Sequence, residues 1–133
     1  MRVKILTIAA ALVLSAPLLA EVPLDPGSTA TVRLSPQGSL AYPIQPAPPH
    51  APANFGAILS IDIDEPGRYH VAIGAPGRVD ISRDGQPFVS LGQQDGAPGS
   101  GIARVLDFDL PAGHYSVALS GMTAGAVSVS VSR

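Results

Sequence analysis

The chain has 133 residues, with 14 glycines, 14 prolines, no cysteine and no tryptophan. This length fits one domain and excludes a two-domain enzyme, and the lack of cysteine excludes a disulfide-stapled scaffold and a thiol nucleophile. The formal net charge is −2 and the six arginines that follow residue 20 are scattered singly, so we expect no nucleic-acid partner, because phosphate binding needs clustered positive charge.

The first 20 residues have the features of an export signal. Arg2 and Lys4 precede an apolar run from Ile5 to Ala16, and the segment ends at Ala20. Such a segment is typical of a secretory signal, and its apolar run is shorter than the roughly 20 residues that span a bilayer. We expect residues 1–20 to be a cleaved signal-peptide helix, an uncleaved anchor being the alternative. The processed chain, with a net charge of −4, is then periplasmic or secreted and has no membrane anchor.

Residues 21–54 are expected to form an N-terminal strand and an extended arm. Every second residue between Ser28 and Leu34 is apolar, which predicts a half-buried strand over residues 28–34. Residues 35–54 contain six prolines. Because proline cannot donate a hydrogen bond to a sheet ladder, this segment is predicted to be an extended, Pro-rich arm. An alternation within the arm predicts an edge strand at Leu40, Tyr42 and Ile44.

Residues 55–133 are expected to form the main part of a single domain that includes strand 28–34. Short runs with alternating apolar residues recur along this segment, and no helical period interrupts them. This pattern predicts an all-β fold, an antiparallel β-sandwich of the jelly-roll type with about seven or eight short strands. The alternating or apolar runs are residues 57–63, 69–73, 79–81, 88–91, 102–110, 115–119 and 127–131.

The segments between these runs carry turn signals. Pro66-Gly67 suits the central positions of a type II turn, and Asp84-Gly85 predicts a tight hairpin. The segment Gly92–Gly101, with four glycines, predicts a flexible loop. Arg104 falls on the same face as the apolar residues of strand 102–110.

Two stretches about 45 residues apart resemble each other. Residues 61–73 and 106–119 each contain a strand with Asp-x-Asp facing outward, a Pro/Gly turn, and a strand that opens with tyrosine. We interpret them as two equivalent hairpins of one sandwich. Tyr69 and Tyr115 are expected to bury their rings and to direct their hydroxyls to the backbone at the corner.

These stretches also carry a family resemblance. Their spaced series of Asp, Pro, Gly, Tyr and Val, with Arg83-Asp84-Gly85 between the copies, resembles small exported β-sandwich domains of the bacterial pre-peptidase C-terminal type. The chain is still more similar, from Gly56 to about Val131, to short exported alphaproteobacterial proteins, some of which carry the label homogentisate 1,2-dioxygenase. The resemblance implies a β-sandwich and export, and the label implies an iron-dependent oxygenase.

The motifs of common enzymes are missing from the sequence. His50, His70 and His114 are followed two positions later by proline, alanine and serine, which does not fit the His-x-carboxylate spacing of a non-haem iron site. No serine lies in a Gly-x-Ser-x-Gly elbow, and the Gly-rich segment 96–101 lacks the lysine of a phosphate loop. We therefore predict no catalytic residue, no metal ligand and no cofactor.

Three binding hypotheses stay open at this point. Carboxylates paired on two strands would offer Ca²⁺ the oxygen ligands it prefers, although such residues also keep a sheet surface solvated. The aromatic rings of Tyr42 and Phe55, beside the arm, would suit a small exposed carbohydrate site, and the arm itself would suit a protein partner. The candidate calcium ligands are Asp62, Asp64, Asp107 and Asp109.

The sequence as a whole favours an exported, non-catalytic binding or interaction module of the bacterial periplasm. Its ligand, a protein, a carbohydrate or another small molecule, is unknown at this stage. The alternatives are a metal-dependent dioxygenase and a structural accessory domain of an envelope protein.

Overall fold

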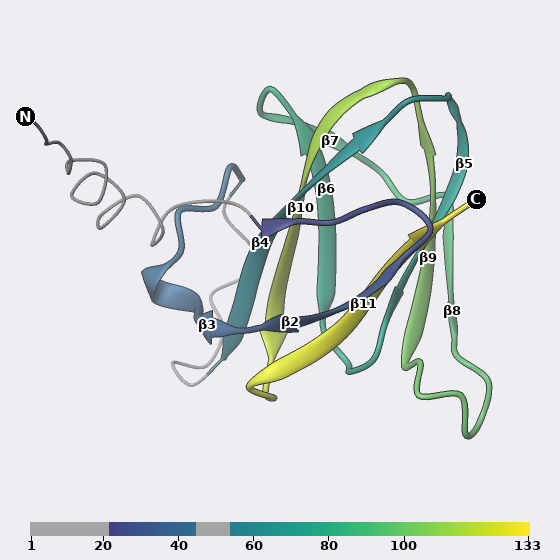
Figure 1. Ribbon diagram of the computed structural model, residues 1–133. Helices are drawn as coiled ribbons and strands as arrows, with labels where there is room; N and C mark the ends of the chain where they lie inside the picture. Colours follow the sequence, from purple (N-terminus) through teal and green to yellow (C-terminus); the bar gives the residue numbers. More distant parts are fainter. Residues whose placement is uncertain (1–21, 45–53) are drawn as a thin grey trace, which may run out of the picture.

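The computed structural model describes residues 22–44 and 54–133. These residues form two β-sheets (Figure 1). Sheet 1 has the strand order β1-β4-β10-β6-β7, with β3 beside β4, and sheet 2 has the order β2-β11-β5-β9-β8. The strands are β1 (Val22–Pro23), β2 (Thr29–Arg33), β3 (Ser35–Pro36), β4 (Phe55–Ile63), β5 (Gly67–Ile73), β6 (Arg78–Arg83), β7 (Gln86–Phe88), β8 (Gly92–Asp95), β9 (Arg104–Leu110), β10 (Gly113–Met122) and β11 (Ala126–Ser132). A short 3₁₀ helix, η3 (Gln37–Ser39), follows β3.

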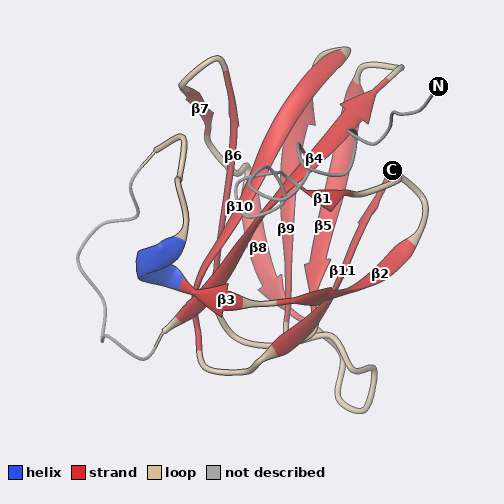
Figure 2. Ribbon diagram, turned by 60° about the vertical axis from the view of Figure 1, so that its left-hand side comes forward, coloured by secondary structure: helices blue, strands red, loops and turns tan. Residues whose placement is uncertain are grey.

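The prediction of an all-β, sandwich-like fold is confirmed (Figure 2). All strand pairs are antiparallel except β1 with β4. The predicted signal peptide, residues 1–20, and residues 45–53 of the predicted arm lie outside the described residues. Within the described part of the chain, no helix is long and apolar enough to cross a membrane.

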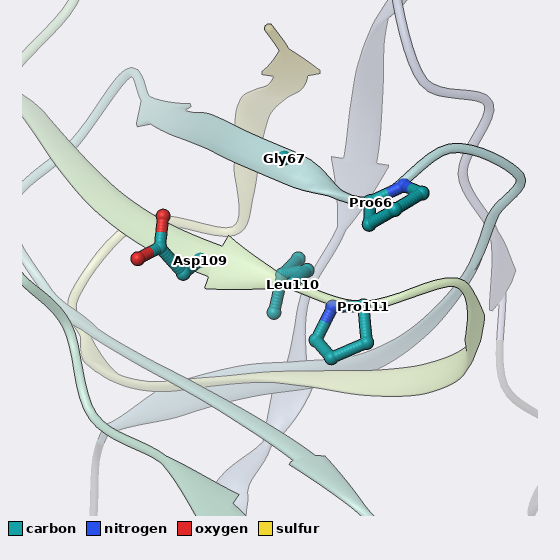
Figure 3. Close-up of a pocket in the computed structure, with 5 residues that line it drawn as sticks. All are labelled: Pro66, Gly67, Asp109, Leu110 and Pro111. Carbon is teal, nitrogen blue, oxygen red and sulfur yellow. The ribbon is translucent and has the colours of Figure 1, made fainter.

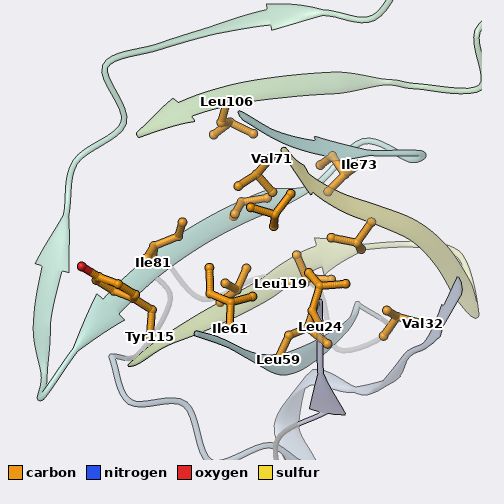
Figure 4. Close-up of a cluster of buried hydrophobic side chains, with 14 of the residues drawn as sticks. Leu24, Val32, Leu59, Ile61, Val71, Ile73, Ile81, Leu106, Tyr115 and Leu119 are labelled. Carbon is orange, nitrogen blue, oxygen red and sulfur yellow. The ribbon is translucent and has the colours of Figure 1, made fainter. Parts of the chain in front are cut away.

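One hydrophobic core lies between the two sheets, because each long strand directs its alternate apolar residues inward. Figure 4 shows side chains of sheet 1, such as Leu59 and Leu119, beside Val71, Ile73 and Leu106 of sheet 2. Val71, Ile73, Leu59 and Leu119 are all fully shielded from solvent. The inward rows that the sequence predicted for these strands are confirmed.

The number of strands and the position of several short ones differ from the prediction. Eleven strands are present among the described residues instead of seven or eight, because two-residue and four-residue strands carry no recognisable alternation. Gly92–Asp95, predicted as the start of a flexible loop, pairs with β9 as β8. The return strand is β7 at Gln86–Phe88 and not residues 88–91, and no strand forms at residues 40–44.

The two similar stretches form sheet-to-sheet corners, so the prediction that each is a hairpin is wrong. The chain leaves sheet 1 after β4 and enters sheet 2 as β5, and it returns from β9 to β10 in the opposite direction. Each strand pairs with a strand of the other stretch, β4 with β10 and β5 with β9. The alternation of apolar residues is the same for a hairpin and for a corner, since both bury one face of each strand.

At each corner the tyrosine hydroxyl forms a hydrogen bond with the backbone, as predicted. The Tyr69 hydroxyl donates to the Glu65 carbonyl oxygen at 2.6 Å, and the Tyr115 hydroxyl donates to the Pro111 carbonyl oxygen at 2.5 Å. An arginine guanidinium lies over each ring, Arg133 over Tyr69 and Arg83 over Tyr115. Burial raises the pKa of Tyr115, while the neighbouring guanidinium acts in the opposite direction.

The turn signals give one confirmed prediction and one correction. Asp84 and Gly85 have φ values of 52° and 77°, as the predicted hairpin turn between β6 and β7 requires. Gly67, in contrast, has no positive φ and already belongs to β5, so the predicted type II turn is absent. A Cβ at this position would lie 3.0 Å from the Arg133 Nη2 atom, at the far end of an exposed side chain.

Tyr42, in the segment that follows η3, is buried against β4 and β10 of sheet 1. Its hydroxyl donates to the Leu119 carbonyl oxygen of β10 at 2.7 Å, and only 8% of the residue is exposed. The close approach depends on Gly56 of β4, since a Cβ at that position would overlap both the Tyr42 hydroxyl and the Leu119 carbonyl. Tyr42 therefore attaches the segment after η3 to the sandwich.

The burial of Tyr42 predicts a loss of stability at alkaline pH. Burial, together with the negative charge of Asp80, raises the pKa of Tyr42 to about 12 from the ordinary value of about 10. The neutral hydroxyl is thus favoured in the folded state, so this contribution is complete below about pH 10 and is lost as the pH rises toward about 12. Tyrosinate absorbance and circular dichroism, followed together, should show late ionisation of Tyr42 that is absent from Tyr42→Phe. An unchanged titration curve in the variant contradicts the expectation.

Candidate binding groove

A groove opens at the edge of the sandwich where the chain passes from β7 of sheet 1 to β8 of sheet 2. β7 pairs with only the second half of β6, from Ile81 to Arg83, so the first half of β6 has no strand on that side among the described residues. The chain then crosses to sheet 2 through residues 89–91. The short β7 therefore leaves a gap beside Arg78, Val79 and Asp80. Side chains of both sheets line this gap.

This edge groove has a volume of about 500 Å³ and combines polar with apolar walls. Val79, Leu106 and Phe108 are buried core residues that reach its floor. The groove is lined by Arg78, Val79, Asp80, Pro87, Phe88, Val89, Ser90, Gln93, Arg104, Leu106 and Phe108. Pockets of this volume with a few polar groups among apolar side chains are typical of small-molecule sites.

Two arginines, Arg78 and Arg104, line the edge groove. The Arg78 Nε atom lies 2.9 Å from the Asp80 Oδ2 atom, forming an ion pair between residues two positions apart in the open half of β6. Arg104 is half-buried, and its Nη1 atom donates to the Gly77 carbonyl oxygen at 2.9 Å. The position of Arg104 on the inward face of β9, seen in the sequence, thus brings its guanidinium to the groove.

Exposed apolar side chains lie beside the groove. Val89 is 83% exposed and Leu91 is 51% exposed, both in the crossing between β7 and β8. Exposed apolar residues gathered near a cavity are typical of a contact surface, whereas isolated ones carry no such meaning. The rim of the edge groove is therefore suited to contact with a ligand.

A second, smaller pocket lies between the two corners (Figure 3). It has a volume of about 250 Å³ and is lined by Pro66, Gly67, Asp109, Leu110 and Pro111. Its carboxylate, Asp109, lies 3.7 Å from the Arg68 Nε atom. This corner pocket offers a ligand apolar contact, and its lining supplies fewer polar groups than the edge groove.

His70 and His114, the two histidines among the described residues, lie in different sheets. His70 Nδ1 lies 2.5 Å from Asp107 Oδ1 in sheet 2, and His114 Nδ1 lies 2.7 Å from Asp62 Oδ1 in sheet 1. His50 lies outside the described residues. In the described ranges, no group of three or more histidine, aspartate or glutamate side chains is placed to hold a metal ion.

The four aspartates considered as calcium ligands are divided between the two sheets. β4, which carries Asp62 and precedes Asp64, pairs with β10, whereas β9, which carries Asp107 and Asp109, pairs with β5 and β8. The condition for a four-carboxylate patch, that their strands be neighbours, is therefore not met. Asp62 and Asp107 face histidines of the other stretch instead.

The exposed aromatic site beside the arm is also absent from the described residues. Tyr42 is buried and its hydroxyl is bonded to the backbone, while Phe55 is partly buried against the core. The aromatic ring that does line a groove is Phe88, which packs edge-on against Tyr115 with 5.2 Å between ring centres. The edge groove itself was not predicted from the sequence, and the basic residue in the apolar row of β9 was the signal for it.

Comparisons with protein-family models, with curated proteins and with solved structures find no match to this chain.

Proposed function

We propose that this chain is an exported, non-catalytic binding module of the bacterial periplasm and that its ligand occupies the edge groove. The observation that carries the proposal is the groove itself, a cavity of about 500 Å³ with arginine, glutamine and serine side chains over an apolar floor. Such a combination orients a ligand through a few polar contacts and gains affinity from apolar burial.

The proposal includes export and a jelly-roll arrangement of the sandwich. Export is supported by the basic, apolar and small-residue order of residues 1–20. The jelly-roll arrangement is supported by strands that alternate between the sheets, from β4 to β5 to β6 and from β9 to β10 to β11. In jelly rolls and related sandwiches, binding sites are carried by edges and connecting loops on a rigid scaffold.

Binding in the groove can be tested by nuclear magnetic resonance on isotope-labelled protein purified from the periplasm of a bacterial host. A probe panel of maltose, phenethylamine and hydrocinnamate covers neutral, cationic and anionic small molecules. We expect at least one probe to change the amide signals of residues that line the groove, with changes concentrated in β6, β7 and β8. The same preparation tests export, because the protein must be recovered from the periplasmic fraction.

A matched pair of variants shows whether the groove is the site. Ser90→Trp places a large side chain in the groove lining, whereas Ser28→Trp adds the same side chain at an exposed position between β1 and β2. The first variant should abolish the signal changes and the second should leave them intact. If no probe perturbs the groove, or if Ser90→Trp binds as well as the parent protein, the proposed function is wrong.

A further inference from the structure

Arg104 differs from Arg68, Arg78 and Arg133 in what it contacts. Arg68, Arg78 and Arg133 each lie within ion-pair distance of a carboxylate. For Arg104, among residues 22–44 and 54–133, the structure gives one hydrogen bond, to the Gly77 carbonyl oxygen. A guanidinium has five N–H donors, so most of the donors of this half-buried group are available toward the groove.

The charges around Arg104 leave the groove positive at this point. Asp80, the carboxylate in the groove lining, is paired with Arg78 at 2.9 Å. Asp95 stands opposite Arg104 in the register of β8 and β9, but it is exposed and no ion pair joins the two. A half-buried cation without a carboxylate partner is electrostatically suited to an anionic ligand, because such pairs gain strength as solvent is excluded.

We propose that the edge groove binds a small organic acid with an apolar body, whose carboxylate pairs with Arg104. This inference rests on the proposed function and names the ligand class of the same site. The planar guanidinium matches a carboxylate through two parallel hydrogen bonds. The apolar body lies against Leu106 and Phe88, which line the groove beside Arg104, so the acid is held by charge at one end and by burial at the other.

The volume and the walls of the groove favour a small acid of this kind. About 500 Å³ accommodates a ligand of modest size. Leu106 and Phe108, neighbouring members of the inward row of β9, supply an apolar floor beside the charge. A fully polar anion would leave this floor without a partner, whereas a neutral apolar compound would leave the guanidinium without one.

The test compares hydrocinnamate with hydrocinnamamide, which has the same apolar body and no charge. Titrations followed by the groove amide signals should show tighter binding of the acid by a factor on the order of ten or more. Arg104→Gln should remove this preference and bind both compounds alike. Arg33→Gln, which removes the same charge from an exposed position on β2 at the far edge of sheet 2, should leave it unchanged.

Two further variants keep the test decisive if Arg104→Gln does not fold. Arg104→Lys retains the charge but loses the planar fork, so the preference for the acid should fall without disappearing. Asp95→Asn removes the negative charge opposite Arg104 and should tighten binding of the acid alone, about twofold at low ionic strength.

The outcomes separate this inference from the proposed function. Equal binding of the acid and the amide in the groove overturns the ligand class and leaves the binding module intact. A preference that persists in Arg104→Gln, or that is undiminished in Arg104→Lys, also overturns it. Absence of groove binding by every probe, including maltose and phenethylamine, rejects the proposed function together with the inference.

Discussion

Replacing Gly56 by alanine is expected to lower the free energy of unfolding by about 3 kcal/mol. A Cβ at this position would overlap the Tyr42 hydroxyl and the Leu119 carbonyl oxygen. Both neighbours are fixed, the first by a buried hydrogen bond and the second by its place in β10. The strand must therefore shift, or Tyr42 must leave its site and expose the surface that it covers. Chemical denaturation followed by circular dichroism measures the loss.

Gly38→Ala is the matched control for this prediction, since nothing lies within 4 Å of a Cβ at that position. It should change the free energy of unfolding by no more than about 0.5 kcal/mol. In a Tyr42→Phe background, which lacks the hydroxyl, the cost of Gly56→Ala should shrink by about 0.5 kcal/mol or more. Equal stability of Gly56→Ala and the parent protein would show that Tyr42 is not seated as described.

Much of the fold could be predicted because alternation determines which side chains are buried. Leu59 and Ile61 of β4, or Val129 and Val131 of β11, occupy every second position and lie in the core. The same alternation does not say which strands pair. β4 and β5 flank a short Pro/Gly segment as hairpin strands do, yet they belong to different sheets. This assignment to different sheets is determined by the pairing of β4 with β10 and of β5 with β9.

The candidate site was harder to predict than the core. The edge groove exists because β7 ends at Phe88 and leaves half of β6 uncovered, and the length of such a short strand is set by tertiary pairing. Arg104 was visible as a charge in an apolar row, but the sequence does not show that Asp80 is paired with Arg78. Likewise, the three-dimensional arrangement alone shows that His70 and His114 lie on different sheets.

The corner of Tyr115 is expected to make one of the largest contributions to stability. Tyr115 is fully buried, packs edge-on against Phe88 and lies beneath the guanidinium of Arg83. Tyr115→Ala removes these contacts and leaves a cavity between the sheets, which should lower the free energy of unfolding by about 4 kcal/mol. This is a large fraction of the roughly 5–15 kcal/mol that stabilises a typical domain. Thermal and chemical denaturation should agree on the loss.

Tyr115→Phe separates the hydrogen bond of the corner from its packing. It keeps the ring and removes only the hydroxyl that donates to the Pro111 carbonyl oxygen, so the expected loss is about 1 kcal/mol. Tyr69→Phe at the second corner removes the corresponding bond to the Glu65 carbonyl oxygen and should cost a similar amount. Because the two hydroxyls bond different carbonyls and the two rings lie beneath different arginines, the losses should add in the double variant. If both single variants unfold like the parent protein, the corners are held by packing alone, and the tyrosines are interchangeable with phenylalanine.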